Sequence, residues 1–243
     1  MPSPLRIAVL ECDAPPADSN ARYGGYHGVF SLLLKESARA LGQPDRLDPE
    51  TGLDISRWDV VYAQEYPRLE DVDAILLTGS KYNSFDDDPW ILKLVEYTKQ
   101  AIDDQRIIGR ALGAKVGRND AGWEIAVCDV DLTEQGKKLF GKDKLQIQQM
   151  HRDIVFDYPP NVVPLGSSPR CAVQGMYRPG HFITVQGHPE FKQDIVSEIV
   201  KLRMSMGAFS KEQGEDALAR AGKDHDGIAI GVAFLKFLLG DIQ

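Results

Sequence analysis

Residues 182–190 have the sequence Phe-Ile-Thr-Val-Gln-Gly-His-Pro-Glu. The run begins with four residues typical of a short buried strand, and glycines bound it on both sides. His188 and Glu190 follow, and side chains two positions apart in an extended segment point the same way. An imidazole beside a carboxylate can be the base and the orienting group of a nucleophilic triad. Taken alone, the pair is better explained as a His-Pro turn at a strand end that exposes two polar side chains.

Strands and helices are predicted to alternate through the first half of the chain. Apolar, β-prone runs predict strands at 5–11, 58–63 and 74–77, with a very short one at 106–108. Helical spacing of apolar residues predicts helices at 26–41 and from Pro89 onward, where Asp88 is a good N-cap. Strands that alternate with helices in this way favour an α/β fold with a doubly wound, mainly parallel sheet.

The pattern changes after residue 122. Further strands are predicted with few helices between them, at 123–132, 145–150, 154–156, 172–176 and 182–185. They indicate an antiparallel extension beside the parallel core. Three helices are then predicted at 194–206, 210–221 and 227–239, the second starting with a capping box of Ser210 and Gln213. We predict a single domain over residues 1–243, with extra C-terminal helices from about residue 208.

Composition narrows the classes of function. The chain has 243 residues and a net charge of −8, and no concentrated basic face is apparent in the sequence. Nucleic acid and anionic membranes are therefore not expected as partners, because phosphate binding needs such a face. The three cysteines, Cys12, Cys128 and Cys171, are too scattered for a disulfide framework, and we expect a cytoplasmic location. The acidic run 86–88 is explained by helix capping and solvated loop charge, so no metal and no cofactor are expected.

Two further stretches carry polar groups at predicted strand ends. Gly79 and Ser80 follow the strand at 74–77, where such a turn can present backbone N–H groups to an oxyanion. His151, Arg152 and Asp153 follow the strand at 145–150 and could contact a substrate. Considered singly, the first is better explained as an ordinary turn and the second as a loop whose side chains pair locally.

Together these motifs resemble the class I glutamine amidotransferase family. The similarity is greatest to its stand-alone branch, which includes amidotransferase-like proteins and γ-glutamyl peptidases. It covers about residues 5–204 and rests on several motifs in the same order along the chain. These motifs are Tyr23-Gly-Gly-Tyr26, Thr78-Gly-Ser80, 85–91, 111–118, Met150-His-Arg-Asp153 and Gln186-Gly-His-Pro-Glu190.

The resemblance implies the flavodoxin-like fold of that family and hydrolysis of a glutamine side-chain amide or a γ-glutamyl bond. A cysteine thiolate attacks the carbonyl in that reaction, and a histidine held by a glutamate carries the proton. By resemblance, His188 is the acid/base and Glu190 orients it, Gly79 and Ser80 lie at the oxyanion turn, and His151, Arg152 and Asp153 contact the substrate. The expected ligand is glutamine or a γ-glutamyl compound. Family members commonly supply ammonia to a synthase, so a partner enzyme in biosynthesis is also implied.

One departure from the family pattern concerns the nucleophile. In the family, the strand before Ala-Leu-Gly-Ala ends in an elbow of the form Gly-x-Cys-x-Gly-x-Gln, which opens a helix. Here Ile107-Ile108-Gly109 continues directly into Arg110-Ala-Leu-Gly113, so roughly nine residues of the elbow are absent. None of the three cysteines is a credible replacement, and Cys12 is the least implausible. We therefore predict that the chain is inactive as it stands.

Three interpretations of the missing elbow remain open. The first is an active family member whose sequence lost the elbow through a gene-model or splicing error, which the retained triad partners favour. The second is a non-catalytic relative, a pseudoenzyme with a binding or regulatory role. The third is an enzyme with another nucleophile. Locally, residues 106–108 are expected to stay a stub of central strand, the alternative being a helix that continues from Pro89 through Leu112.

Overall fold

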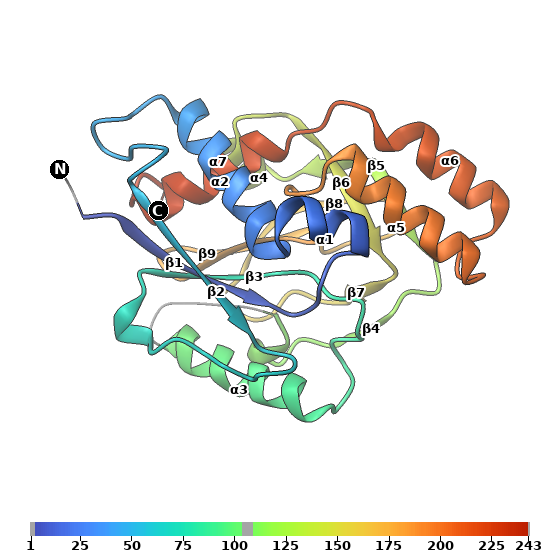
Figure 1. The fold of residues 1–243 in the computed structure, drawn as a ribbon, viewed down its shortest axis with the longest axis horizontal. Helices are drawn as coiled ribbons and strands as arrows, with labels where there is room; N and C mark the ends of the chain where they lie inside the picture. The colour runs from blue at the N-terminus through green and yellow to red at the C-terminus, as the bar shows by residue number, and fades with distance from the viewer. Residues whose placement is uncertain (1–2, 104–108, 243) are drawn as a thin grey trace.

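A parallel three-stranded sheet organises the N-terminal half of the protein. The computed structural model describes residues 3–103 and 109–242 (Figure 1). The strands lie in the order β2-β1-β3, and Ile7 on the central strand lies opposite Ile55 and Ala74. Their bounds are β1 Leu5–Glu11, β2 Leu53–Asp59 and β3 Ala74–Leu77.

Helices cover both faces of this sheet. Successive side chains of β1 point to opposite faces. Ile7 packs with Leu34 and Leu235, whereas Ala8 and Leu10 pack with Trp90 and other residues on the opposite side. Figure 1 shows helices on both sides of the sheet. These are α2 (Tyr26–Leu41) and α7 (Gly227–Leu238) on the side of Ile7, and α3 (Pro89–Asp103) on the side of Ala8. The doubly wound arrangement is therefore confirmed.

A larger antiparallel sheet forms the other half, with strand order β10-β9-β8-β5-β6. It contains β5 Glu124–Leu132, β6 Lys144–His151, β8 Val163–Ser167, β9 Gly175–Arg178 and β10 Phe182–Val185. A two-stranded ladder pairs β4 (Val116–Arg118) with β7 (Asp153–Val155). The remaining helices are α1 Ala17–Tyr23, α4 Glu134–Phe140, α5 Gln193–Ser205 and α6 Lys211–Ala221, with short 3₁₀ turns at Leu69–Asp71 and Gly109–Leu112. The predicted antiparallel part is confirmed.

Some element boundaries differ from the sequence prediction. The strand expected at 58–63 is wrong, because the carboxylate of Asp59 accepts hydrogen bonds from the backbone N–H groups of Val61 and Tyr62 and turns the chain. The strand expected at 172–176 begins only at Gly175. The stub expected at 106–108, and its helical alternative, lie outside the described residues. The division into a single domain with extra C-terminal helices stays a prediction.

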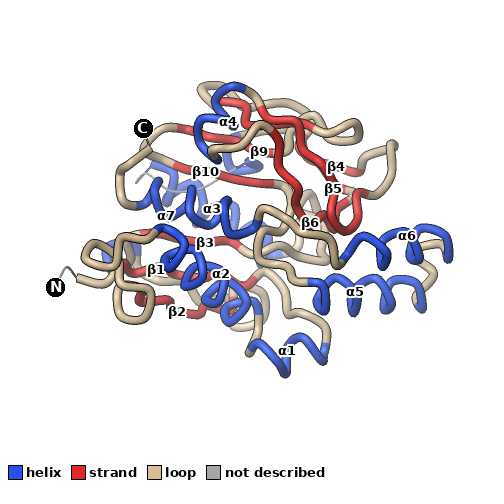
Figure 2. Tube along the Cα trace, turned by 90° about the horizontal axis from the view of Figure 1, so that it is seen from above, coloured by secondary structure: helices blue, strands red, loops and turns tan. Residues whose placement is uncertain are grey.

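In Figure 2 the two sheets lie in succession, with β3 as the strand of the first sheet nearest to the second and β10 as the strand of the second nearest to the first. Residues of both strands line one large cavity of about 1380 Å³. The loops after β3 and β10, which carry the predicted site residues, line the same cavity. In the described part of the chain, no helix is both long and apolar enough to span a membrane.

Candidate active site

His188 lies just beyond β10, in a position determined by three contacts. Its backbone N–H donates to Gln148 O at 2.7 Å, which ties the turn to β6. Its Nδ1 lies 2.8 Å from Glu190 Oε1, and its ring stacks on Phe191 with centroids 4.0 Å apart. The Glu190 side chain is only 2% exposed, against 16% for His188. The predicted pairing of imidazole and carboxylate is therefore present in the structure.

The turn after β3 lies directly against this imidazole. A Cβ atom added to Gly79 would lie 2.6 Å from His188 Cε1, so the close approach depends on glycine. Two neighbouring side chains hold the turn to the end of β1: Cys12 N–H donates to Thr78 Oγ1 at 2.9 Å, and Ser80 Oγ donates to Cys12 O at 2.8 Å. The Ser80 hydroxyl is thus engaged in positioning the turn. Gly79 and His188, which are far apart in the sequence, are brought together.

Cys12 lies at the same edge of the sheet but is a poor nucleophile. It is 4% exposed, and its Sγ lies 3.7 Å from Leu10 O. Burial raises the pKa of the Cys12 thiol to about 12, although its hydrogen bond with Thr78 acts in the opposite direction. Burial also raises the pKa of Cys128, and that of Cys171 to about 11. Because the thiolate is the reactive form, none of the three is activated.

The predicted substrate-binding residues lie on another wall of the cavity, at the end of β6 and the start of β7. Both ring nitrogens of His151 face oxygens: Nδ1 is 3.2 Å from Asp153 O, and Nε2 is 3.2 Å from Glu124 Oε2. The Asp153 carboxylate pairs with Arg118 at 2.8 Å. Arg152 Nε is buried, and no described residue hydrogen-bonds to it. His151 Nε2 is likewise buried without a hydrogen bond from the described residues, although it faces Glu124.

Glu124 is a buried carboxylate that the sequence analysis did not single out. Burial acts to raise its pKa, but hydrogen bonds with His151 and Ser168 outweigh burial and lower it. Gln174 Nε2 donates to Glu124 Oε2 at 2.8 Å. Within the described residues, no group of three or more His, Cys, Asp or Glu side chains is placed to hold a metal ion. The expectation of no metal and no cofactor stays a prediction.

Comparison with known proteins identifies the family. A glutamine amidotransferase-like protein of Schizosaccharomyces pombe is 32% identical over 249 residues, covering 96% of this chain and 98% of the relative. The chain belongs to the glutamine amidotransferase-like family. γ-Glutamyl peptidase 4 of Arabidopsis thaliana is 28% identical to this glutamine amidotransferase-like protein over 224 residues, covering 83% of the chain and 82% of the relative. No protein-family model matches the chain.

The fold of the chain is also that of known glutamine amidotransferases. The crystal structure of a glutamine amidotransferase from Thermotoga maritima superposes with a TM-score of 0.70 at 15% identity, covering 96% of this chain and 98% of the other. This similarity confirms the predicted glutamine amidotransferase fold.

Two residues at the candidate site had no signal in the sequence. Glu124 lies opposite His151 in the β5–β6 ladder, and only the strand register reveals that pairing. Arg203 of α5 lies over the ring of Trp123 and lines the cavity, but in the sequence it is one of many helical arginines. No local motif could have identified either residue.

Proposed function

We propose that this protein binds the side-chain amide of glutamine, or a γ-glutamyl bond, against His188 and Glu190. The observation that carries the proposal is the hydrogen bonding of the two ring nitrogens of His188. Nδ1 is held by a buried carboxylate, while no described residue hydrogen-bonds to Nε2. An imidazole fixed at one nitrogen and open at the other is arranged for proton transfer at a neighbouring ligand.

The proposed roles follow from this geometry. Nδ1–H donates to Glu190, which holds the ring in one tautomer. Nε2 is then the atom that takes a proton from a nucleophile and returns it to the leaving amine. Backbone N–H groups at Gly79 and Ser80, next to the ring, would stabilise the oxyanion. His151, Arg152 and Asp153, at the end of β6 and the start of β7, would contact the amino-acid end of the substrate.

We further propose that the chain as it stands does not hydrolyse its ligand, because the family elbow that carries the cysteine is absent from the sequence. Removing the nucleophile of a triad protease alone costs on the order of 10⁶ in rate. Cys12 does not compensate, since a thiol with a pKa of about 12 is almost entirely protonated near neutral pH.

The test is an assay of ammonia release from glutamine and of cleavage of γ-glutamyl peptides, with the purified protein and with Cys12→Ala. No turnover above the buffer rate is expected from either. Turnover by the unaltered chain contradicts the proposed inactivity. If that turnover survives Cys12→Ala, Cys12 is excluded as its source.

The γ-glutamyl peptidase function is the second candidate. The cavity of about 1380 Å³ exceeds the about 300–1,000 Å³ of common ligand pockets, which leaves room for a ligand larger than glutamine. Ammonia supply to a synthase in a biosynthetic transferase reaction is the first candidate, as the family resemblance implies, and a non-catalytic regulatory role is the third. Inserting an elbow of the family form and comparing the two substrates separates the first two. In each case we place the protein in the cytoplasm, where thiols such as its three free cysteines stay reduced.

A further inference from the structure

We propose that Arg203 is the anchor for a carboxylate of the bound ligand. This inference rests on the proposed function, because it assigns a group that recognises the same ligand. No sequence motif and no named relative points to this residue. Four observations support the assignment. The guanidinium has no acidic partner among the described residues, and aromatic rings pack against it. Exposed apolar side chains lie near it, and a row of rings leads from it to His188.

The Arg203 guanidinium has no acidic partner among the described residues. The arginines at positions 6, 22, 118 and 220 each form an ion pair with an aspartate. No hydrogen bond or ion pair connects the Arg203 side chain to the rest of the described chain, although Asp13 and Tyr26 interact with it electrostatically. Asp13 itself is held by Lys81 Nζ at 2.7 Å. Burial lowers the pKa of Arg203, which reflects the cost of a charge without a paired anion.

Aromatic rings hold this cation in place. The guanidinium carbon lies 4.6 Å from the centroid of the Trp123 ring and 5.6 Å from that of Phe209. Trp123 and Phe209 also contact one another edge to face. The guanidinium is planar, and its fork of N–H groups matches the two oxygens of a carboxylate; the rings beside it hold this fork in one orientation. The group is therefore preorganised for an anion that the described protein does not supply.

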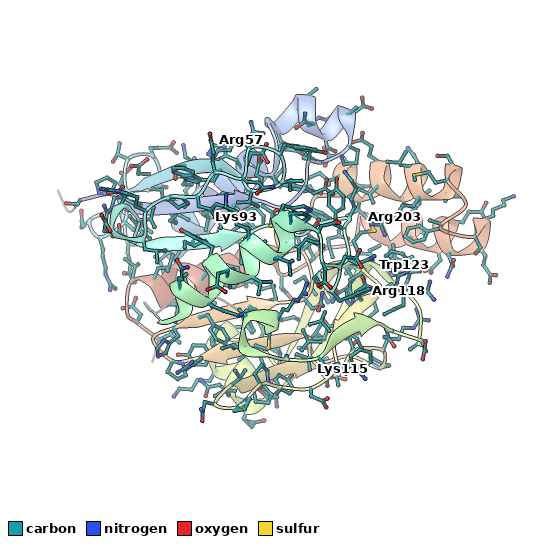
Figure 3. All side chains as sticks on the ribbon, turned by 90° about the horizontal axis from the view of Figure 1, so that it is seen from below. Arg57, Lys93, Lys115, Arg118, Trp123 and Arg203 are labelled. Atoms are coloured by element: carbon teal, nitrogen blue, oxygen red, sulfur yellow. The ribbon has the colours of Figure 1, made fainter. Side chains whose placement is uncertain are left out.

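The surroundings of Arg203 also indicate a missing organic ligand. Leu202 and Met206, on either side of it in the sequence, are 48% and 72% exposed, whereas most large apolar side chains are covered. Both line the same cavity as Arg203. Figure 3 shows Arg203, Trp123 and Arg118 along one side of the molecule, and all three line this cavity. An anion with an apolar body would cover the cation and these side chains together.

A row of rings connects Arg203 to His188. Tyr26, which interacts electrostatically with Arg203, stacks on Phe191 at 6.2 Å, and Phe191 stacks on His188 at 4.0 Å. A ligand whose amide lies at His188 could therefore extend along these rings and place a carboxylate at Arg203. Two carboxylates qualify: the α-carboxylate of the γ-glutamyl unit, and the C-terminal carboxylate of a peptide on the other side of the bond.

The experiment is isothermal titration calorimetry of the full chain with two pairs of ligands. The first pair is L-glutamine and its α-amide, and the second is γ-glutamylglycine and its C-terminal amide. Arg203→Met keeps an apolar stem on Trp123 and removes the charge. Lys201→Met, on an exposed residue of the same helix, is the control for net charge. Hydrogen bonds to a charged group predict that Arg203→Met binds the acid form about ten- to a hundredfold more weakly.

The amide forms identify which carboxylate is bound. The amide that lacks the anchored carboxylate should bind the unaltered protein weakly. Its affinity should not fall further in Arg203→Met. Lys201→Met should bind all four ligands with the affinity of the unaltered protein. Unchanged affinity of both acids in Arg203→Met would overturn this inference and leave the proposed function standing. The same holds if acid and amide forms lose affinity equally. Absence of binding by all four ligands to the unaltered protein would overturn both.

Discussion

Two pairs of imidazole and carboxylate lie at the cavity, and they are built differently: His188, Glu190 and His151 line it, whereas Glu124 does not. In the first, His188 Nδ1 lies 2.8 Å from Glu190, and Nε2 has no partner among the described residues. In the second, His151 lies 3.2 Å from Glu124 through Nε2 and 3.2 Å from Asp153 O through Nδ1. Both carboxylates are buried. The difference is that both nitrogens of His151 face protein oxygens, although its buried Nε2 makes no hydrogen bond, whereas His188 Nε2 faces no oxygen of the described residues.

The two pairs also differ in how the chain brings them together. His188 and Glu190 are two positions apart and meet through local backbone geometry. Glu124 and His151 meet only because β5 and β6 pair in antiparallel register. A pair of side chains beside a turn at the cavity can act on a bound ligand. A pair between two strands holds those strands together. We therefore expect the first pair to affect chemistry and the second to affect stability.

The largest expected effect is on catalysis at the first pair. In a chain to which the elbow has been restored, His188→Ala should lower the rate of ammonia release by a factor on the order of 10⁶, as for a triad histidine. Glu190→Gln should lower it on the order of 10⁴, because the ring loses its preferred tautomer. His151→Asn should raise KM more than it lowers kcat, since its proposed role is contact with the substrate. Steady-state kinetics with glutamine and with a γ-glutamyl peptide measure all three.

Circular dichroism of each variant serves as the control for folding. An equal loss of kcat in His188→Ala and His151→Asn would remove the proposed distinction between the pairs. It would assign both imidazoles to the reaction.

A smaller effect, on stability, is expected at the second pair. Glu124→Ala leaves His151 and Gln174 without their shared carboxylate, and breaking a buried pair costs about 3 kcal/mol of unfolding free energy. The pKa of Glu124 is lowered in the folded state, so its contribution is present above the unfolded pKa of about 4.3 and is lost as the pH falls through the folded value. Urea unfolding of the unaltered protein and of Glu124→Ala, at neutral and at acid pH, therefore tests both the size of the stability loss and the direction of its pH dependence.

Glu215→Ala is the control for removing a carboxylate, because Glu215 is 63% exposed and, among the residues that the structure describes, forms an ion pair only with Lys211 at 3.7 Å. It should change the unfolding free energy by less than about 1 kcal/mol. If the difference between the unaltered protein and Glu124→Ala were the same at both pH values, the carboxylate would not be the source of the effect.

Much of the fold could be predicted because the local signals agree with the tertiary structure. The predicted bounds of β1, α2, β3 and β10 match the structure to the residue. The helix α4 was missed because Gly136 lies inside it, and glycine is a poor helix former. The structure explains this glycine, since a Cβ there would lie 2.1 Å from Leu165 O. Close packing against β8 is a tertiary requirement that the local sequence does not reveal.

In the candidate site, too, local contacts could be predicted from the sequence and tertiary contacts could not. The pairing of His188 with Glu190 was predictable because it depends on two neighbouring positions after one strand. The contact of Gly79 with His188 depends on how two different sheets meet, and only the motif order suggested it. Glu124 and Arg203 depend on strand register and on the packing of α5 against Trp123. No signal within a few residues of either one encodes those contacts.

The smallest effect is expected at Gly79, where the first pair meets the turn after β3. Gly79 does not have a positive φ, so alanine is compatible with the backbone, and the cost of Gly79→Ala comes from contact alone. The new Cβ would lie 2.6 Å from His188 Cε1, while Glu190 and Phe191 hold the ring on its other sides. Overpacking of this kind costs about 2 kcal/mol, measurable as a lower urea midpoint. The double variant Gly79→Ala with His188→Ala should recover that loss, because the clashing ring is gone. A single variant as stable as the unaltered protein would show that the imidazole can leave its position freely, which is incompatible with a ring held for proton transfer.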